Sequence, residues 1–354
     1  MDVKQITLIV PQGEGIRIKV TSSFPNEPII RQTPGRSGCW RGASFVIDDD
    51  QMDCDYWVVL TDFVRPQTAV CRAGRVILTT MEPPENKQYH PGFLRQFDLI
   101  LTSYRGLDHP NVRNDCQGLP WHAGLNRGAA GTHGDEGFRC EIDYDRFVRM
   151  SPPTKSGLLS TICSSSTALT GHRARRAFVE KLKNCLGDKL VLFGRGVNPV
   201  SDKWEAIAPF KYHLVLENSA VPDYWSEKLA DCYLGFAYPI YWGCPNILDY
   251  FSPQSLTSID LNYPDAAIDK IQEIINSPLW QNSLPNILTA RQLVLDEYNT
   301  FDVILKACLS LSPASSRRVR LKPNRFFGRL RPTRIWKSLL FRSKRAFRAR
   351  AFQQ

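Results

Sequence analysis

Short runs of consecutive apolar residues recur through the first 150 residues, separated by polar segments that contain Gly and Pro. Such runs, which do not alternate with polar residues, are typical of strands buried on both faces of a parallel sheet. The predicted strands are Gln5–Val10, Ile16–Val20, Tyr56–Asp62, Val76–Thr80 and Asp98–Ser103. Residues 106–137 are rich in Gly, His and Asn without a clear period, so we expect a loop that could line a site.

The pattern restarts at Ser151-Pro152-Pro153, where we expect a linker. Strands are predicted at Leu158–Cys163, Leu190–Phe193, His213–Glu217 and Pro239–Trp242, with helices at Arg173–Leu186, Trp204–Ala208 and Trp225–Gly235 and over 265–276 and 287–310. Alternation of strands and helices favours an α/β domain with a parallel sheet. We therefore predict α/β domains over residues 1–150 and 151–312, a tail over 313–354, and a site in the cleft between the domains.

Charge is distributed unevenly along the 354 residues, whose net charge is +10. Residues 313–354 carry 14 of the 45 Lys and Arg and no acidic residue, so the rest of the chain holds 31 basic and 35 acidic residues. The body is mildly acidic, and the net charge gives no reason to expect it to bind nucleic acid. We expect neither a membrane span nor a secretory signal, because no apolar run approaches ~18 residues and the N-terminus lacks a cleavage site.

The ten cysteines form no CxxC pair and have no His-x₃₋₅-His partner, which argues against a zinc site. Asp48-Asp49-Asp50 resembles an Asp-x-Asp metal motif but lies in a polar loop, and we expect no metal there. Apolar surroundings of several cysteines and the lack of an Asn-x-Ser/Thr sequon favour a reducing, cytosolic compartment.

The segment from Lys211 to Asp260 concentrates the candidate chemistry. The predicted strand His213–Glu217 leads into a polar turn, and Asp223 or Ser226 is placed to cap the helix that follows. Ligands of parallel α/β sheets bind beyond the carboxyl ends of the strands, and a helix start suits a phosphate. The Glu and Lys in the first helical turn then fit a ribose and a diphosphate, although an ordinary capped helix with a surface Glu–Lys pair has the same pattern.

This segment resembles the signature of glycosyltransferase family 10, the α-1,3/1,4-fucosyltransferases. The matching residues are Glu217-Asn218-Ser219, Asp223-Tyr224, Glu227-Lys228-Leu229 and Tyr238-Pro239-Ile240-Tyr241-Trp242-Gly243. The resemblance implies a GT-B fold, in which two Rossmann-like α/β domains face each other across a cleft. It also implies GDP-fucose as the donor, inversion at the anomeric carbon, and no required metal or other cofactor.

Donor-binding residues follow from the resemblance position by position. Asn218, Tyr224, Glu227 and Lys228 match positions that hold GDP-fucose, with Lys228 on the diphosphate and Glu227 on the ribose. A family arginine three residues before an aromatic, also on the diphosphate, corresponds to Arg175.

Which arginine of this run matches the family position is undecided by a residue or so, because Arg173 and Arg176 flank Arg175. A solvated basic helix face would have the same pattern.

The catalytic base is expected from the other domain, because Thr79–Glu85 follows a strand and resembles the family's Glu-containing turn. An acceptor hydroxyl must lose its proton as it attacks the sugar, so one carboxylate is needed. Glu82 is the predicted base and Glu85 the second choice, since the doubled Pro departs from the commoner family pattern; a plain loop Glu is the alternative. Trp121 and His122, in a loose match to an acceptor-side turn, could contact an acceptor sugar, although a structural His fits equally.

The tail interleaves basic residues with aromatic ones. A helical wheel places Ile335, Trp336, Leu339, Leu340, Phe347 and Ala351 on one face, which is the composition of an amphipathic helix on anionic lipid. Bacterial members of the family often end in similar tails. A disordered tail or an RNA-binding arm are the alternatives.

The prediction is thus an inverting fucosyltransferase that moves fucose from GDP-fucose to a hydroxyl of an oligosaccharide or glycolipid acceptor, with α-1,3 linkage on a surface polysaccharide. It would work in the cytoplasm, peripherally at the inner face of the membrane, without binding nucleic acid. Two alternatives remain: a transferase of another GDP-sugar, and a non-catalytic glycan-binding protein with a degenerate transferase fold.

Overall fold

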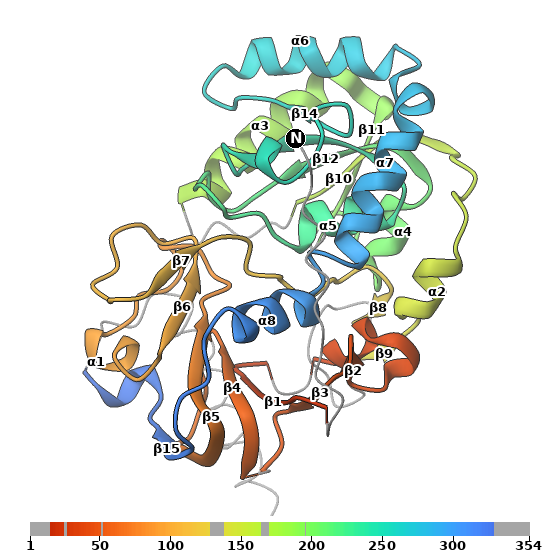
Figure 1. Ribbon diagram of the computed structural model, residues 1–354. Helices are drawn as coiled ribbons and strands as arrows, with labels where there is room; N and C mark the ends of the chain where they lie inside the picture. The colour runs from red at the N-terminus through yellow and green to blue at the C-terminus, as the bar shows by residue number, and fades with distance from the viewer. Residues whose placement is uncertain are drawn as a thin grey trace, which may run out of the picture.

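The computed structural model describes residues 15–24, 27–50, 52–127, 138–163, 170–194 and 196–328. Figure 1 shows two α/β domains, each built on its own sheet, with the chain passing between them more than once. The predicted strand Gln5–Val10 lies outside the described residues.

The first domain is built on a sheet whose described strands lie in the order β2-β3-β1-β4-β5-β6-β7, with β15 beside β5. Their bounds are β1 Arg17–Ser22, β2 Cys39–Trp40, β3 Ala43–Ile47, β4 Asp53–Leu60, β5 Gln67–Thr79, β6 Leu99–Thr102, β7 Val112–Asn114 and β15 Arg317–Leu321. From β3 to β7 all neighbours run parallel, and Val58 of β4 pairs with Ile77 of β5. The predicted strands from Ile16 onward are confirmed, because apolar runs such as Trp57–Leu60 are buried on both faces of the sheet.

The second domain contains a parallel sheet in the order β11-β10-β12-β13-β14. Its strands are β10 Gly157–Ile162, β11 Leu190–Phe193, β12 Phe210–Leu216, β13 Tyr238–Trp242 and β14 Thr257–Ser258, and its helices are α3 Thr170–Leu186, α4 Lys203–Ile207, α5 Glu227–Leu234, α6 Pro264–Ile275 and α7 Leu279–Leu295. Helices α4 and α5 pack on β10, β12 and β13. Two such domains confirm the predicted GT-B fold.

The chain returns to the first domain after α7, which differs from the predicted domain boundary at residue 312. Helix α8 (Thr300–Leu309) buries Phe301 against Phe45 of β3, with ring centroids 4.9 Å apart. Strand β15 then pairs antiparallel with β5 and buries Val319 and Leu321. Residues 313–328 are therefore part of the first domain rather than of a tail, and the predicted amphipathic helix over 329–354 lies outside the described residues.

Between the two domains lies the segment predicted as a loop, of which residues 106–127 are described. It is mostly irregular, and the short elements near it are α1 Pro91–Leu94, β8 Leu125–Asn126, β9 Arg139–Cys140 and α2 Tyr144–Arg149. Buried Arg31 donates hydrogen bonds to the carbonyls of Trp121, Ala123 and Ile142. These bonds satisfy backbone groups that no strand partner takes up, and they hold the segment in place.

Candidate active site

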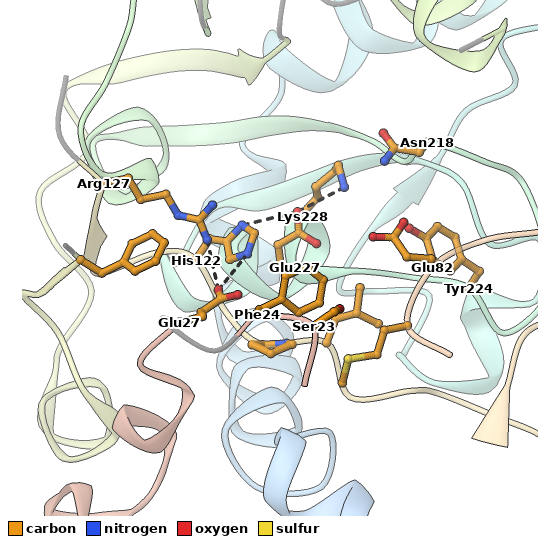
Figure 2. Close-up of a pocket in the computed structure, with 14 residues that line it drawn as sticks. Ser23, Phe24, Glu27, Glu82, His122, Arg127, Asn218, Tyr224, Glu227 and Lys228 are labelled. Carbon is orange, nitrogen blue, oxygen red and sulfur yellow. Dashed lines mark hydrogen bonds and ion pairs between the residues drawn. The ribbon is translucent and has the colours of Figure 1, made fainter. Parts of the chain in front are cut away.

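A cavity of about 450 Å³ lies where the two domains meet, at the carboxyl ends of strands from both sheets. Glu82 follows β5 of the first domain, and Asn218 follows β12 of the second. Figure 2 shows Glu82 beside Tyr224, Lys228 and Glu227 in the middle, and His122 toward the other end. Parallel α/β sheets bind ligands at this edge, so the cavity is the candidate active site.

Lys228 lies in the first turn of α5, which Ser226 caps. Its Nζ lies 3.2 Å from Oε1 of Glu227 and 3.4 Å from Oε2 of the fully buried Glu217. Glu217 also accepts hydrogen bonds from the backbone N (2.8 Å) and Oγ (2.6 Å) of Ser226. Burial alone would lower the pKa of Lys228, but the two carboxylates raise its pKa above the ordinary value, so the ammonium stays charged.

Glu227 is also held in its charged form. Burial would raise its pKa, but the nearby ammonium groups of Lys228 and Lys203 outweigh this and hold the pKa well below the ordinary value. The Lys203 Nζ lies 3.2 Å from Oε1 of Glu227 and 3.4 Å from Oδ2 of Asp231. A half-buried carboxylate that stays ionised accepts hydrogen bonds and does not donate them.

Glu82 sits in a turn that begins after β5, where Met81 adopts a positive φ of 56°. Asn86 donates a hydrogen bond from Nδ2 to Oε2 of Glu82 at 3.0 Å. Burial raises the pKa of the Glu82 carboxyl, and the charge of Glu227 adds to that rise. A half-buried carboxyl with a raised pKa, facing a cavity, is suited to accepting a proton.

Arg175 on α3 points toward the site. It is buried, and its Nη1 donates to Oδ1 of Asn218 at 2.5 Å, while its buried Nε has no hydrogen-bond partner within the described part of the chain. A second cavity of about 300 Å³ is lined by Arg175 and shares Asn218, Glu227 and Lys228 with the first. Arg176 instead forms an exposed ion pair with Glu180, and the side chain of Arg173 lies outside the described residues. Of the two arginines whose side chains are described here, Arg175 is the one that reaches the cavity.

The structure thus brings five of the predicted residues to the first cavity and Arg175 to the second. The five are Glu82, Asn218, Tyr224, Glu227 and Lys228. Tyr224 is buried, and burial raises its pKa well above the ordinary value, so its hydroxyl stays protonated. The roles assigned to these residues remain predictions, but their proximity is a property of the fold.

At the other end of the cavity, the sequence analysis named His122 but missed Glu27 and Arg127, which lie beside it. Nε2 of His122 lies 3.4 Å from Oε1 of Glu27, which Arg127 also contacts at 3.1 Å, and Nδ1 of His122 lies 3.7 Å from Oε1 of Glu227. His122 lines the cavity, whereas Trp121 is buried against Phe147 and does not line it. No motif links Glu27 to Arg127, because they are a hundred residues apart and only the fold joins them.

The described residues contain neither a metal-binding cluster nor a membrane-spanning helix. Within them, no group of three or more His, Cys, Asp or Glu is placed to hold a metal ion, and Asp48 accepts hydrogen bonds from Ser22. Across the same ranges, no helix has the length and apolarity to cross a membrane.

Over 126 residues, 34% of this chain, the sequence is 33% identical to the alpha-(1,3)-fucosyltransferase FucT of Helicobacter pylori. The resemblance to glycosyltransferase family 10 is confirmed. The match spans 25% of that relative, so this chain covers about a quarter of the length of the curated relative it matches. No model of a known protein family matches the chain.

Solved structures similar to this chain include an alpha1,3-fucosyltransferase with GDP, at a TM-score of 0.46 and 17% identity over 85% of this chain and 94% of that one. Another is an alpha-glucosyltransferase in complex with UDP and a 13-mer DNA, at a TM-score of 0.44 and 11% identity over 83% of this chain and all of that one.

Proposed function

We propose that this chain is an inverting fucosyltransferase that moves fucose from GDP-fucose to a hydroxyl of a glycan, with α-1,3 linkage on a surface polysaccharide. The observation that carries the proposal is that Glu82 of one domain and Lys228 of the other line the same cavity. The similarity to a bacterial alpha-(1,3)-fucosyltransferase supports the donor and the reaction class.

In the proposed reaction, the acceptor oxygen attacks C1 of fucose while the bond from C1 to the GDP oxygen breaks. The hydroxyl proton passes to the carboxylate of Glu82, and GDP leaves with the electron pair of the broken bond. Lys228 and Arg175 stabilise the negative charge that develops on the leaving diphosphate. One displacement needs one base, so inversion follows without a covalent intermediate, unlike the two-step reaction of retaining glycosidases with their paired carboxylates.

A donor screen tests this function directly. The purified full chain is incubated with GDP-fucose, GDP-mannose or another nucleotide sugar and a glycan array, and GDP release and product linkage are measured. We expect GDP-fucose to be consumed at least ten times faster than the other donors, with an α-1,3-fucosylated product. Preference for GDP-mannose would favour a transferase of another GDP-sugar. Binding of a donor without its hydrolysis or transfer would favour a non-catalytic glycan-binding protein.

The pH dependence of turnover follows from the raised pKa of Glu82. Glu82 must be ionised to accept a proton, so the rate falls as pH drops through its pKa. Burial, reinforced by Glu227 and opposed by Asn86, Lys228 and Lys87, raises that pKa above the ordinary 4.5. We therefore expect the acidic limb of kcat/KM against pH to lie above 4.5 and to disappear in Glu82→Gln. A limb at or below 4.5 would contradict the assignment.

We also propose that the protein works in the cytoplasm, peripherally on the inner face of the membrane. The support is the sequence of residues 329–354, where aromatic residues are interleaved among basic ones, a composition typical of helices that bind anionic lipid.

A further inference from the structure

Asp223, which the sequence suggested only as a helix cap, lies at the centre of a polar cluster between the two domains. Ser226, not Asp223, caps α5. The carboxylate of Asp223 accepts from Nδ2 of Asn246 at 2.8 Å and from the hydroxyl of Tyr250 at 2.7 Å, both in its own domain. Nη2 of Arg105, in the first domain, donates to the other carboxylate oxygen. One buried carboxylate therefore joins both domains.

The backbone of Asp223 is held as firmly as its side chain. Its N–H donates to Oδ1 of Asn246 at 2.9 Å, and its carbonyl accepts from Nε2 of Gln117, in the segment after β7, at 3.1 Å. Its φ is +61°, in the left-handed region where Asp is tolerated better than most residues. This backbone turn leads directly to Tyr224, whose side chain lines the cavity.

Arg105 is connected to the other side of the site in a similar way. Its neighbour Tyr104 is buried, and the Tyr104 hydroxyl donates to the carbonyls of Pro83 (3.2 Å) and Lys87, which lie in the turn that carries Glu82. A second contact joins the same two parts of the chain, since the Ser219 hydroxyl donates to Oε2 of Glu85 at 2.8 Å. The turn of Glu82 and the loop of Tyr224 are thus joined across the domain boundary at two points.

We propose that Arg105 and Asp223 are positioning residues that set the distance between the Glu82 turn and the donor-binding loop over residues 218–224. The pair touches none of the reacting groups; it acts through Tyr104 and Tyr224. This inference rests on the proposed function for its effect on catalysis, while the physical coupling of the two segments is independent of it. Misplacement of a base by about 1 Å can lower a rate by ~10²-fold, so a contact of this kind has a large effect on turnover.

The test uses Arg105→Ala in the full chain, because this change leaves the bonds of Asp223 to Asn246 and Tyr250 in place. We expect kcat to fall about tenfold while the Kd for GDP changes less than twofold, because the diphosphate-binding residues Lys228 and Arg175 belong to the second domain. Arg72→Ala is the matched control: the Arg72 side chain is 55% exposed and that of Arg105 is 51%, and Arg72 pairs with Asp53 inside one domain. We expect Arg72→Ala to leave both quantities unchanged.

Hydrogen–deuterium exchange separates this proposal from the proposed function, because it needs no turnover. Arg105→Ala should speed exchange in peptides that cover 80–90 and 216–226, relative to the wild type and to Arg72→Ala. Asp223→Gly removes the carboxylate without strain at positive φ, and adding Arg105→Ala to it should change kcat no further. Unchanged exchange would overturn the coupling, and faster exchange with wild-type kcat would overturn the positioning role.

Discussion

Glu82→Gln lowers kcat by about 10³-fold while GDP-fucose binds with nearly wild-type affinity; this is the first and largest effect we expect. Removal of a general base costs typically ~10²–10⁴-fold, and the amide of Gln cannot take the proton of the acceptor hydroxyl. Gln keeps the size of Glu and an oxygen that can still accept from Asn86. Steady-state kinetics and calorimetric titration of the donor measure the two quantities separately.

Glu85→Gln is the control for this prediction, because Glu85 lies three residues further along the same turn and was the second choice for the base. Glu85 is exposed and accepts a hydrogen bond from Ser219, which a Gln oxygen can also accept. We expect less than a threefold change in kcat. A Glu82→Gln enzyme within tenfold of the wild-type rate would refute the assignment, and a large loss in Glu85→Gln would move the base to that residue.

Lys228→Met weakens GDP binding by about 100-fold, the second large effect we expect. A hydrogen bond to a charged group contributes about 1.5–3 kcal/mol, and Lys228 is the ammonium placed among the donor-binding residues at the start of α5. Its loss also leaves Glu217 and Glu227 without their shared cation, so the melting temperature should fall as well. Titration with GDP measures the affinity, and thermal unfolding reports the stability.

Lys181→Met is the matched control, because Lys181 lies on α3 and its 44% exposed side chain forms an ion pair with Asp265 away from both cavities. GDP affinity and melting temperature should both stay at wild-type values. If Lys228→Met binds GDP as tightly as Lys181→Met does, the diphosphate does not sit at the start of α5, and the donor assignment fails with it.

The sequence pattern around Arg175 predicts a helix but does not show which of its arginines faces the site. Neighbouring residues on a helix point about 100° apart, so the run from Arg173 to Arg176 fixes a basic helix but not which side chain faces inward. The packing of α3 decides this: Arg175 turns toward Asn218, and Arg176 turns toward solvent and Glu180.

Strand β15 was not predicted, because its many basic residues favoured a tail over a strand. Val319 and Leu321 alternate with Arg318 and Arg320, which is the period of a strand with one buried face. The many basic residues around them instead favoured a tail. Pairing with β5, some 250 residues earlier in the chain, makes this segment a strand, and no local signal reports that pairing.

The sequence by itself determined most of the parallel strands, a helix with Glu227 and Lys228 at or near its first turn, and the presence of Glu82 after a strand, because each depends on the residues next to it. Only the tertiary structure decided that Glu82 and Lys228 share a cavity, that Glu27, His122 and Arg127 extend it, and that Asp223 joins two domains. Contacts of that kind are made between segments far apart in the chain. They follow from how whole sheets pack against one another, which no window of neighbouring residues encodes.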